Sequence, residues 1–378
     1  MSDQISASVA DGLGHVTLDR PQALNALSYE MIRELTAVFE AWRNDSEVGL
    51  VVLDGAGERG FSAGGDIREL YGYATNGNAA EAREFFRAEY RLDAMIARYP
   101  KPVVAIMDGI TMGGGIGLAG HAAIRVVTER SRVAMPETRI GFTPDVGGSW
   151  LLARAPGELG VHLALNSRTM DAADALHAGF ADSFVPSEQL PHLVQALAER
   201  ADPGSPAEIV MLFDETPGPS TLALARDWVD ACYSAPTVAG IIARLHAFAE
   251  GRATASTEPG STGLLPTRPL DPAASAYAAA AADELETLSP TALTVTLESV
   301  RRARTLPNLE AALEQEFRLV SWFIEQHDLR EGIRAQVIDK DRSPKWSPST
   351  LDDVDPRLAA RVIEEQVHDP VWPAPVVE

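Results

Sequence analysis

Two short apolar runs, each closed by Asp-Gly, constrain the fold of this chain most strongly. VGLVVLDG (48–55) and PVVAIMDG (102–109) each follow a helical pattern, at 29–45 and 79–100. Continuously apolar runs of this length are typical of strands that are buried on both faces of a parallel sheet. Further strand-like runs lie at 15–19, 123–129 and 132–137. The alternation of strands and helices predicts an α/β fold with a mostly parallel sheet.

The character of the sequence changes after about residue 155, where short helical patterns replace the strands. We therefore expect two regions, an α/β core at 1–200 and a mainly helical region at 201–378. Within the second region, residues 251–276 are rich in Gly, Pro, Ser and Thr, which predicts a surface loop or linker.

Composition excludes several classes of function. The chain has 378 residues with 32 basic and 54 acidic side chains, a net charge of −22, so nucleic acid is not an expected partner. No apolar run reaches the roughly 20 residues that span a bilayer, and the first residues lack a signal-peptide pattern, so a cytoplasmic protein without a membrane partner is expected. Cys232 is the single cysteine, and no spacing of the eight histidines is typical of a zinc site, so we expect neither a disulfide nor a metal.

Two glycine-rich turns could present free backbone N–H groups to a ligand. They are GFSAGGDIREL (60–70) and DGITMGGGIGLAGH (108–121), and each follows a predicted strand and opens a helix. Counted from Gly113, the second turn does not give the dinucleotide motif G-x-G-x-x-G, because Leu118 stands at its last position, and neither turn contains the P-loop motif. Such amides can hold a developing negative charge, although each turn is also explained by tight packing of small residues.

A third stretch, MPETRIGFTPDVGG (135–148), places Glu137 and Asp145 in surroundings that are otherwise apolar and glycine-rich, apart from Arg139. Carboxylates are rarely buried without a partner, so each acid is either exposed, a helix cap or functional. Asp145 is as well explained by capping the following helix as by function, whereas Glu137 is less well explained by a cap. Glycine amides beside an acid suit acyl chemistry, because the amides hold an oxyanion while the carboxylate attacks or activates water.

Taken in order, RPQALNALS, FSAGGDI, KPVVAIMDGITMGGGIGLA and MPETRIGFTPDVGG resemble the crotonase (enoyl-CoA hydratase/isomerase) superfamily. The resemblance covers about residues 5–200 and implies a crotonase-like spiral of ββα units that carries an acyl-CoA site. Asp145 and the segment QEFRLVSWFIEQHDLREGIRAQVIDKDRSPKWSP are most similar to the 3-hydroxyisobutyryl-CoA hydrolase branch of that superfamily. An acyl-CoA thioester hydrolase is therefore expected.

The resemblance also implies roles for individual residues. The backbone amides of Gly65 and Gly114 would form the oxyanion hole, with Glu137 as the catalytic acid and Asp145 as the second acid. The residues implied to contact the coenzyme A part of the substrate are Ala23, Leu24, Ala26, Ala63, Gly64, Asp66 and Ile67. No separate cofactor is expected, because coenzyme A belongs to the substrate. A homo-oligomer is consistent with the family, but the longer C-terminal segment leaves its size open.

Gly117 marks a departure from the hydratases, which place a second glutamate there. Glycine has no proton to exchange, so hydration by the usual glutamate pair is not expected unless Asp145 replaces the missing acid. Two alternatives stay open: an enoyl-CoA isomerase or hydratase that uses a single acid, and a catalytically silent acyl-CoA-binding protein.

Overall fold

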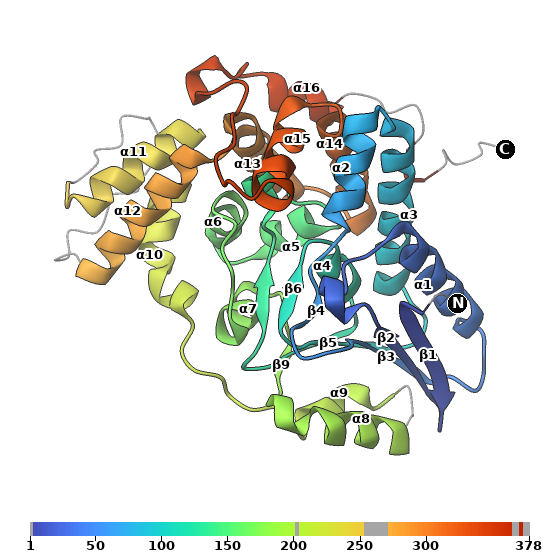
Figure 1. The fold of residues 1–378 in the computed structure, drawn as a ribbon. Helices are drawn as coiled ribbons and strands as arrows, with labels where there is room; N and C mark the ends of the chain where they lie inside the picture. Colours follow the sequence, from blue (N-terminus) through green and yellow to red (C-terminus); the bar gives the residue numbers. More distant parts are fainter. Residues whose placement is uncertain (1–2, 201–203, 253–270, 365–369, 373–378) are drawn as a thin grey trace.

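The computed structural model describes residues 3–200, 204–252, 271–364 and 370–372. The predicted α/β class is confirmed, since helices surround two sheets whose strand pairs are parallel apart from one. The first and last coloured segments in Figure 1 lie on the same side of the molecule.

The larger sheet has six strands in the order β1-β2-β3-β5-β7-β9. Their bounds are Ile5–Ala10, Leu13–Leu18, Leu50–Gly55, Val103–Met107, Ile124–Val127 and Ser183–Phe184. Strands β1 and β2 form an antiparallel hairpin, and every later neighbour joins in parallel. The predicted strands at 48–55 and 102–109 are β3 and β5, and they lie side by side as central strands.

A smaller parallel sheet has the order β4-β6-β8, with bounds Gly60–Ser62, Ile110–Met112 and Arg132–Ala134. Strands β4 and β6 lie inside the two glycine-rich turns, where the sequence analysis expected only loop and helix. Because both strands are parallel and adjacent, the segments that follow them meet at one end of this sheet.

Eleven of the described helical segments belong to the first 200 residues. Their bounds are η1 Pro21–Ala23, α1 Tyr29–Trp42, α2 Ile67–Asn76, α3 Ala79–Ala97, α4 Gly114–Ala119, η2 Glu137–Ile140, α5 Gly148–Arg154, α6 Leu159–Leu165, α7 Ala172–Ala178 and α8 Leu190–Glu199, together with the short turn η3 Ser187–Gln189 before α8. Helix α3 buries Phe85, Phe86 and Tyr90 against the core, and it buries two acids on the same face.

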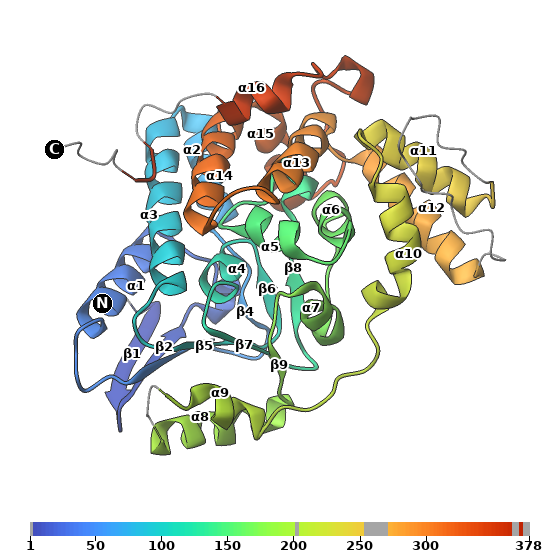
Figure 2. The ribbon, with the colours of Figure 1, turned by 180° about the vertical axis from the view of Figure 1, so that it is seen from behind.

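The later part of the chain is helical in the described residues. Its bounds are α9 Pro206–Met211, α10 Thr221–Tyr233, α11 Val238–Ala249, α12 Pro272–Thr287, α13 Pro290–Ala303, α14 Leu309–Phe323, α15 His327–Ile333, η4 Arg334–Ile338, η5 Leu351–Asp353 and α16 Leu358–Glu364. Helices α13 and α14 pack on α5, α14 also packs on α3, and α15 packs on α2 and η2. Figures 1 and 2 show these helices on the side of the molecule opposite to α8 and α9, which lie beneath the larger sheet.

One apolar cluster joins both parts of the chain, with members from Ile5 to Val371. The boundary near residue 200 stays a prediction, because the later helices share the core of the earlier region.

The loop that was expected at about 251–276 is partly wrong. Residues 253–270 lie outside the described residues, but α12 already begins at Pro272, where the Asp271 side chain accepts a hydrogen bond from the Ala273 N–H. Among the described residues, no helix has the length and apolar character needed to cross a membrane.

Candidate active site

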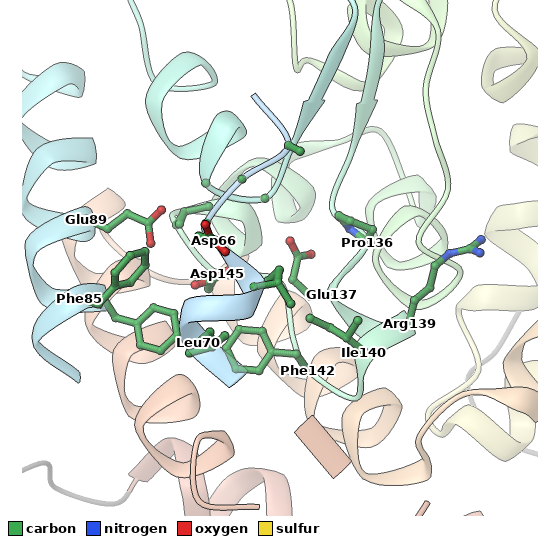
Figure 3. A pocket seen from close by; sticks show the side chains of 18 of the residues that line it. Asp66, Leu70, Phe85, Glu89, Pro136, Glu137, Arg139, Ile140, Phe142 and Asp145 are labelled. Carbon is green, nitrogen blue, oxygen red and sulfur yellow. The ribbon is translucent and has the colours of Figure 1, made fainter. Parts of the chain in front are cut away.

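A cavity of about 250 Å³ lies where the two glycine-rich turns meet α2, α3 and η2 (Figure 3). Most of its wall is apolar, formed by Ala63, Ile67, Leu70, Phe85, Phe86, Pro136, Ile140, Phe142 and Val146. The glycines and acids that the sequence analysis assigned to chemistry also line it: Gly65, Gly114, Glu137 and Asp145. The structure therefore brings together four residues that are up to 80 positions apart in the chain (65 to 145).

The two turns touch through their glycines. Gly64 has a φ of +95°, and a Cβ added there would lie 2.8 Å from the Met112 carbonyl oxygen and 3.0 Å from the Gly114 nitrogen. A side chain at this position would therefore be strained and would separate the turns. Within the described part of the chain, the N–H groups of Gly65 and Gly114 have no hydrogen-bond acceptor. Both amides are consequently available to a ligand oxygen in the cavity.

Glu137 begins the short helix η2, directly after β8 and Met135-Pro136, and the residue is 6% exposed. Its Oε1 is near the second turn, because a Cβ built on Gly113 would lie 3.2 Å from it. Its Oε2 is buried without a hydrogen-bond partner. Burial raises the pKa of Glu137 well above its ordinary value, and repulsion from Asp145 raises it further. A buried carboxyl group beside free backbone amides suits acyl chemistry, because the amides can bind an oxyanion while the carboxylate attacks or activates water.

Asp145 is 5% exposed and accepts a hydrogen bond from the Tyr90 hydroxyl of α3 at 2.8 Å. Burial raises its pKa to about 7, although the Tyr90 hydrogen bond opposes that rise. The alternative that its side chain caps the next helix is wrong. The N-terminal amides of α5 are instead bound by Glu316 of α14, which accepts from the Gly147 and Ser149 N–H groups at 2.7 and 2.9 Å. Asp145 is thus left facing the cavity.

The sequence analysis missed three buried acids near this site: Glu89 and Asp93 of α3, and Glu316 of α14. Glu89 lines the cavity, and Figure 3 shows its carboxyl group directed toward the same space as Glu137 and Asp145. Burial raises the pKa of both Glu89 and Asp93 well above their ordinary values, and like charges nearby add to the effect. A signal for the α3 acids exists in the sequence, since Glu89 and Asp93 share the helical face of Phe85 and Phe86.

Gly117 faces Asp93 rather than the cavity. A Cβ at position 117 would lie 2.7 Å from Asp93 Oδ2 and 2.8 Å from the Val146 Cβ. A glutamate at 117 would therefore not fit beside these neighbours. The expectation that Asp145 alone could supply a second acid is incomplete, because Glu89 also lines the cavity.

The residues expected to contact coenzyme A divide into two groups. Ala63, Gly64, Asp66 and Ile67 line the cavity, whereas Ala23, Leu24 and Ala26 do not. The second group runs alongside the first, with the Ala63 N–H donating to the Leu24 carbonyl at 2.9 Å. Asp66 caps α2 and pairs with Arg20 at 2.8 Å. Contact of either group with coenzyme A stays a prediction.

Among the described residues, no group of three or more His, Cys, Asp or Glu side chains is arranged to hold a metal ion. Of the other polar groups at the cavity wall, Arg139 pairs with Glu284, and the Tyr73 hydroxyl donates to Glu69 at 2.6 Å. Both are therefore engaged away from the reacting centre.

Comparison with known proteins adds independent information. The family model described as enoyl-CoA hydratase/isomerase matches residues 13–363. A zebrafish (Danio rerio) protein named 3-hydroxyisobutyryl-CoA hydrolase, mitochondrial, is 38% identical over 346 residues, covering 89% of this chain and 83% of that protein. The human protein of the same name is 36% identical over 349 residues, covering 90% and 83%.

Two solved structures are similar over nearly their whole length. One is described as a carnitinyl-CoA dehydratase from Mycobacterium thermoresistibile, with 42% identity, a TM-score of 0.86, and coverage of 98% of this chain and 99% of that one. The other is described as an enoyl-CoA hydratase from Rhodobacter sphaeroides, with 40% identity, a TM-score of 0.82, and coverage of 96% and 97%. The match to the family model, the identity to these relatives and the shared fold lead to one conclusion: the chain belongs to the enoyl-CoA hydratase/isomerase family.

Proposed function

We propose that this protein hydrolyses a short, branched β-hydroxyacyl-CoA thioester, namely 3-hydroxyisobutyryl-CoA, to 3-hydroxyisobutyrate and coenzyme A. The observation that carries the proposal is the meeting of two free glycine amides with the Glu137 carboxyl group, whose Oε2 has no partner, in one small apolar cavity. The relatives named as hydrolases of this thioester support the choice of substrate. A volume of about 250 Å³ suits a short acyl group.

The thioester oxygen would lie between the N–H groups of Gly65 and Gly114. These amides stabilise the oxyanion of the tetrahedral intermediate, and each such donor contributes roughly 3 kcal/mol in other oxyanion holes. The amides are fixed by the turns before the substrate arrives, so little reorganisation is needed during the reaction.

Glu137 would act in its ionised form by one of two routes. As a nucleophile it attacks the carbonyl carbon, expels the thiolate and forms a mixed anhydride that water then cleaves. As a general base it removes a proton from a water that attacks the same carbon. In either route the C–S bond breaks, a C–O bond forms, and the thiolate takes up a proton. Asp145, with a pKa of about 7, can be that proton donor near neutral pH.

Coenzyme A would follow the segment from Ala23 to Ala26 and the turn at 63–67, and no further cofactor is required by this chemistry. We propose that the reaction belongs to valine catabolism. We retain a cytoplasmic location as part of the proposal, although the similar vertebrate proteins are named mitochondrial.

A second candidate is addition of water to an enoyl-CoA, or its reverse. It is favoured by the two solved structures described as a dehydratase and a hydratase, and by the second acid, Glu89, at the cavity wall. The missing glutamate at 117 argues against it.

One experiment separates the two candidates. The protein is incubated with 3-hydroxyisobutyryl-CoA and a thiol reagent, and in parallel with crotonyl-CoA while the enoyl absorbance is followed. We expect thiol release and a stable enoyl absorbance. Loss of the enoyl absorbance without thiol release would replace the hydrolase by a hydratase, and neither signal, with acyl-CoA binding intact, would indicate a silent binding protein.

A further inference from the structure

Glu89 is an acid at the cavity wall to which the mechanism above gives no role. It is 2% exposed, it comes from the middle of α3, and its Oε1 is buried without a hydrogen-bond partner. A buried polar atom without a partner is costly, so an unpartnered acid at a binding cavity calls for a ligand group that completes it.

Glu89 lies directly beside the proposed oxyanion hole. A Cβ built on Gly114 would be 2.3 Å from Glu89 Oε1 and 3.2 Å from the Gly65 nitrogen. Any side chain at 114 would therefore collide with this carboxyl group. Glycine at this position makes room for the acid as well as for the thioester oxygen.

Three other charged groups at the cavity wall already have partners. Asp66 binds Arg20 and the α2 amides, Asp145 accepts from Tyr90, and the charged group of Arg139 pairs with Glu284. Glu137 is unpaired but is assigned to the reacting carbonyl. Glu89 is thus the remaining acid at the wall with an unpartnered oxygen, and its surroundings, Phe85 and Phe86 on the same helix, are apolar.

We propose that Glu89 is the specificity-determining residue that binds the β-hydroxyl of the acyl group. A protonated carboxylic acid offers one O–H donor and one carbonyl acceptor, which matches a hydroxyl that both donates and accepts. The hydroxyl is two carbons from the thioester carbonyl, so a group adjacent to the oxyanion hole is in a suitable position to reach it. Asp145 is less suited to this task because the Tyr90 hydroxyl already occupies one of its oxygens. This inference rests on the proposed hydrolase function.

The test compares thiol release from 3-hydroxyisobutyryl-CoA and from isobutyryl-CoA, which lacks only the hydroxyl. The full-length protein is used as wild type, Glu89→Gln and Glu89→Leu. We expect the ratio of kcat/KM for the hydroxylated over the plain ester to fall about tenfold or more in Glu89→Leu, the effect of losing one hydrogen bond and leaving the hydroxyl unpaired. Glu89→Gln keeps a donor and an acceptor and should retain most of the ratio.

Asp93→Asn is the matched control, because Asp93 is buried one helical turn away but does not line the cavity. Its ratio should equal that of the wild type. An equal loss on both esters in Glu89→Leu, with the thermal unfolding transition intact, would overturn the inference, and so would an unchanged ratio. Absence of thiol release from either ester with the wild type would instead overturn the proposed function, and this inference with it.

Discussion

Buried acids occur in two settings in this protein, and they differ in how their oxygens are satisfied. Asp174, Glu316 and Asp328, the anchoring acids, each accept two or more hydrogen bonds from other segments. Glu89 and Glu137, the cavity acids, each keep a buried oxygen without a partner. The anchoring acids hold helices in place, whereas the cavity acids are poised for a ligand.

The free-energy cost of burying a carboxylate also differs between the anchoring acids and the cavity acids. A carboxylate that accepts several N–H or O–H bonds regains much of the free energy that burial removes, but an unpaired one does not. Among the buried acids in the described residues, those with an unpartnered oxygen are Glu89 and Glu137 at the cavity and Asp93, one helical turn from Glu89. Asp145 is intermediate, since it has one partner, Tyr90, and also lines the cavity.

The largest expected effect is on turnover, from a variant of a cavity acid. Glu137→Gln removes the ionisable group and should lower kcat by roughly 10³-fold, since nucleophilic or general-base action is lost. Thiol release measures kcat, and thermal unfolding checks that the fold is intact. A variant with the turnover of the wild type would remove Glu137 from the mechanism.

The second-largest effect is expected on kcat when the turn that carries the Gly65 amide is altered. Variants of two adjacent glycines, Gly64 and Gly65, test it. Gly64→Ala should lower kcat by about 10²-fold and also lower stability, because φ is +95° and the Met112 carbonyl leaves no room. Gly65→Ala should change both much less, since its added Cβ would make ordinary contacts of 3.5 and 3.6 Å with the Phe85 ring. Comparable losses in the two variants would contradict a geometric role for the turn at Gly64.

The pH dependence of kcat/KM should distinguish the cavity acid Glu137 from the anchoring acids. Glu137 must be ionised to act, and its pKa is raised by burial and by Asp145, so activity should fall as the pH is lowered through that raised pKa. The fall should approach about tenfold per pH unit, with an apparent pKa well above that of an ordinary glutamate. A constant rate between pH 5 and pH 8, within about a factor of two, would contradict an essential buried base.

An anchoring acid should show the opposite pattern. Asp174 of α7 accepts from the Ser220 and Thr221 hydroxyls and from the Leu222 N–H, at 2.7, 2.9 and 3.0 Å. Asp174→Asn should lower the free energy of unfolding by about 1–3 kcal/mol, since an amide nitrogen cannot accept these bonds. Urea unfolding measures the loss, and kcat should stay close to the wild-type value. A large loss of turnover without loss of stability would contradict the anchoring role of Asp174.

The smallest effect is expected at Asp93, whose two oxygens are both buried without partners. Its pKa is raised in the folded protein, so the native state holds the proton more tightly than the unfolded chain does. Its stabilising contribution is therefore full below the unfolded pKa and is lost as the pH rises toward the folded pKa. Asp93→Asn should match the stability of the wild type at about pH 3, below the pKa of an unfolded aspartate, and should be the more stable protein, by on the order of 1 kcal/mol or more, at about pH 8. Equal stability of the two proteins at both pH values would indicate that burial does not raise the pKa of Asp93.

The same contrast explains how much of the molecule could be predicted from sequence. Strands β3 and β5 are predictable because strands buried on both faces are continuously apolar, and Glu137 and Asp145 stand out because their stretch is otherwise nearly uncharged. Glu89 can be placed on the apolar face of α3 from its spacing to Phe85 and Phe86, but the sequence does not show that this face meets the cavity. Glu316 cannot be assigned at all, since it binds amides 167 and 169 positions away.

The central claim is that the Glu137 carboxyl group lies beside a thioester whose oxygen is bound by two glycine amides. A crystal structure of Glu137→Gln with 3-hydroxyisobutyryl-CoA tests it most directly. We expect the thioester oxygen within roughly 3 Å of both the Gly65 and the Gly114 nitrogens, with the residue-137 side chain facing the carbonyl carbon. A thioester bound with its oxygen away from these amides, or with residue 137 on the far side of the acyl group, would contradict the account.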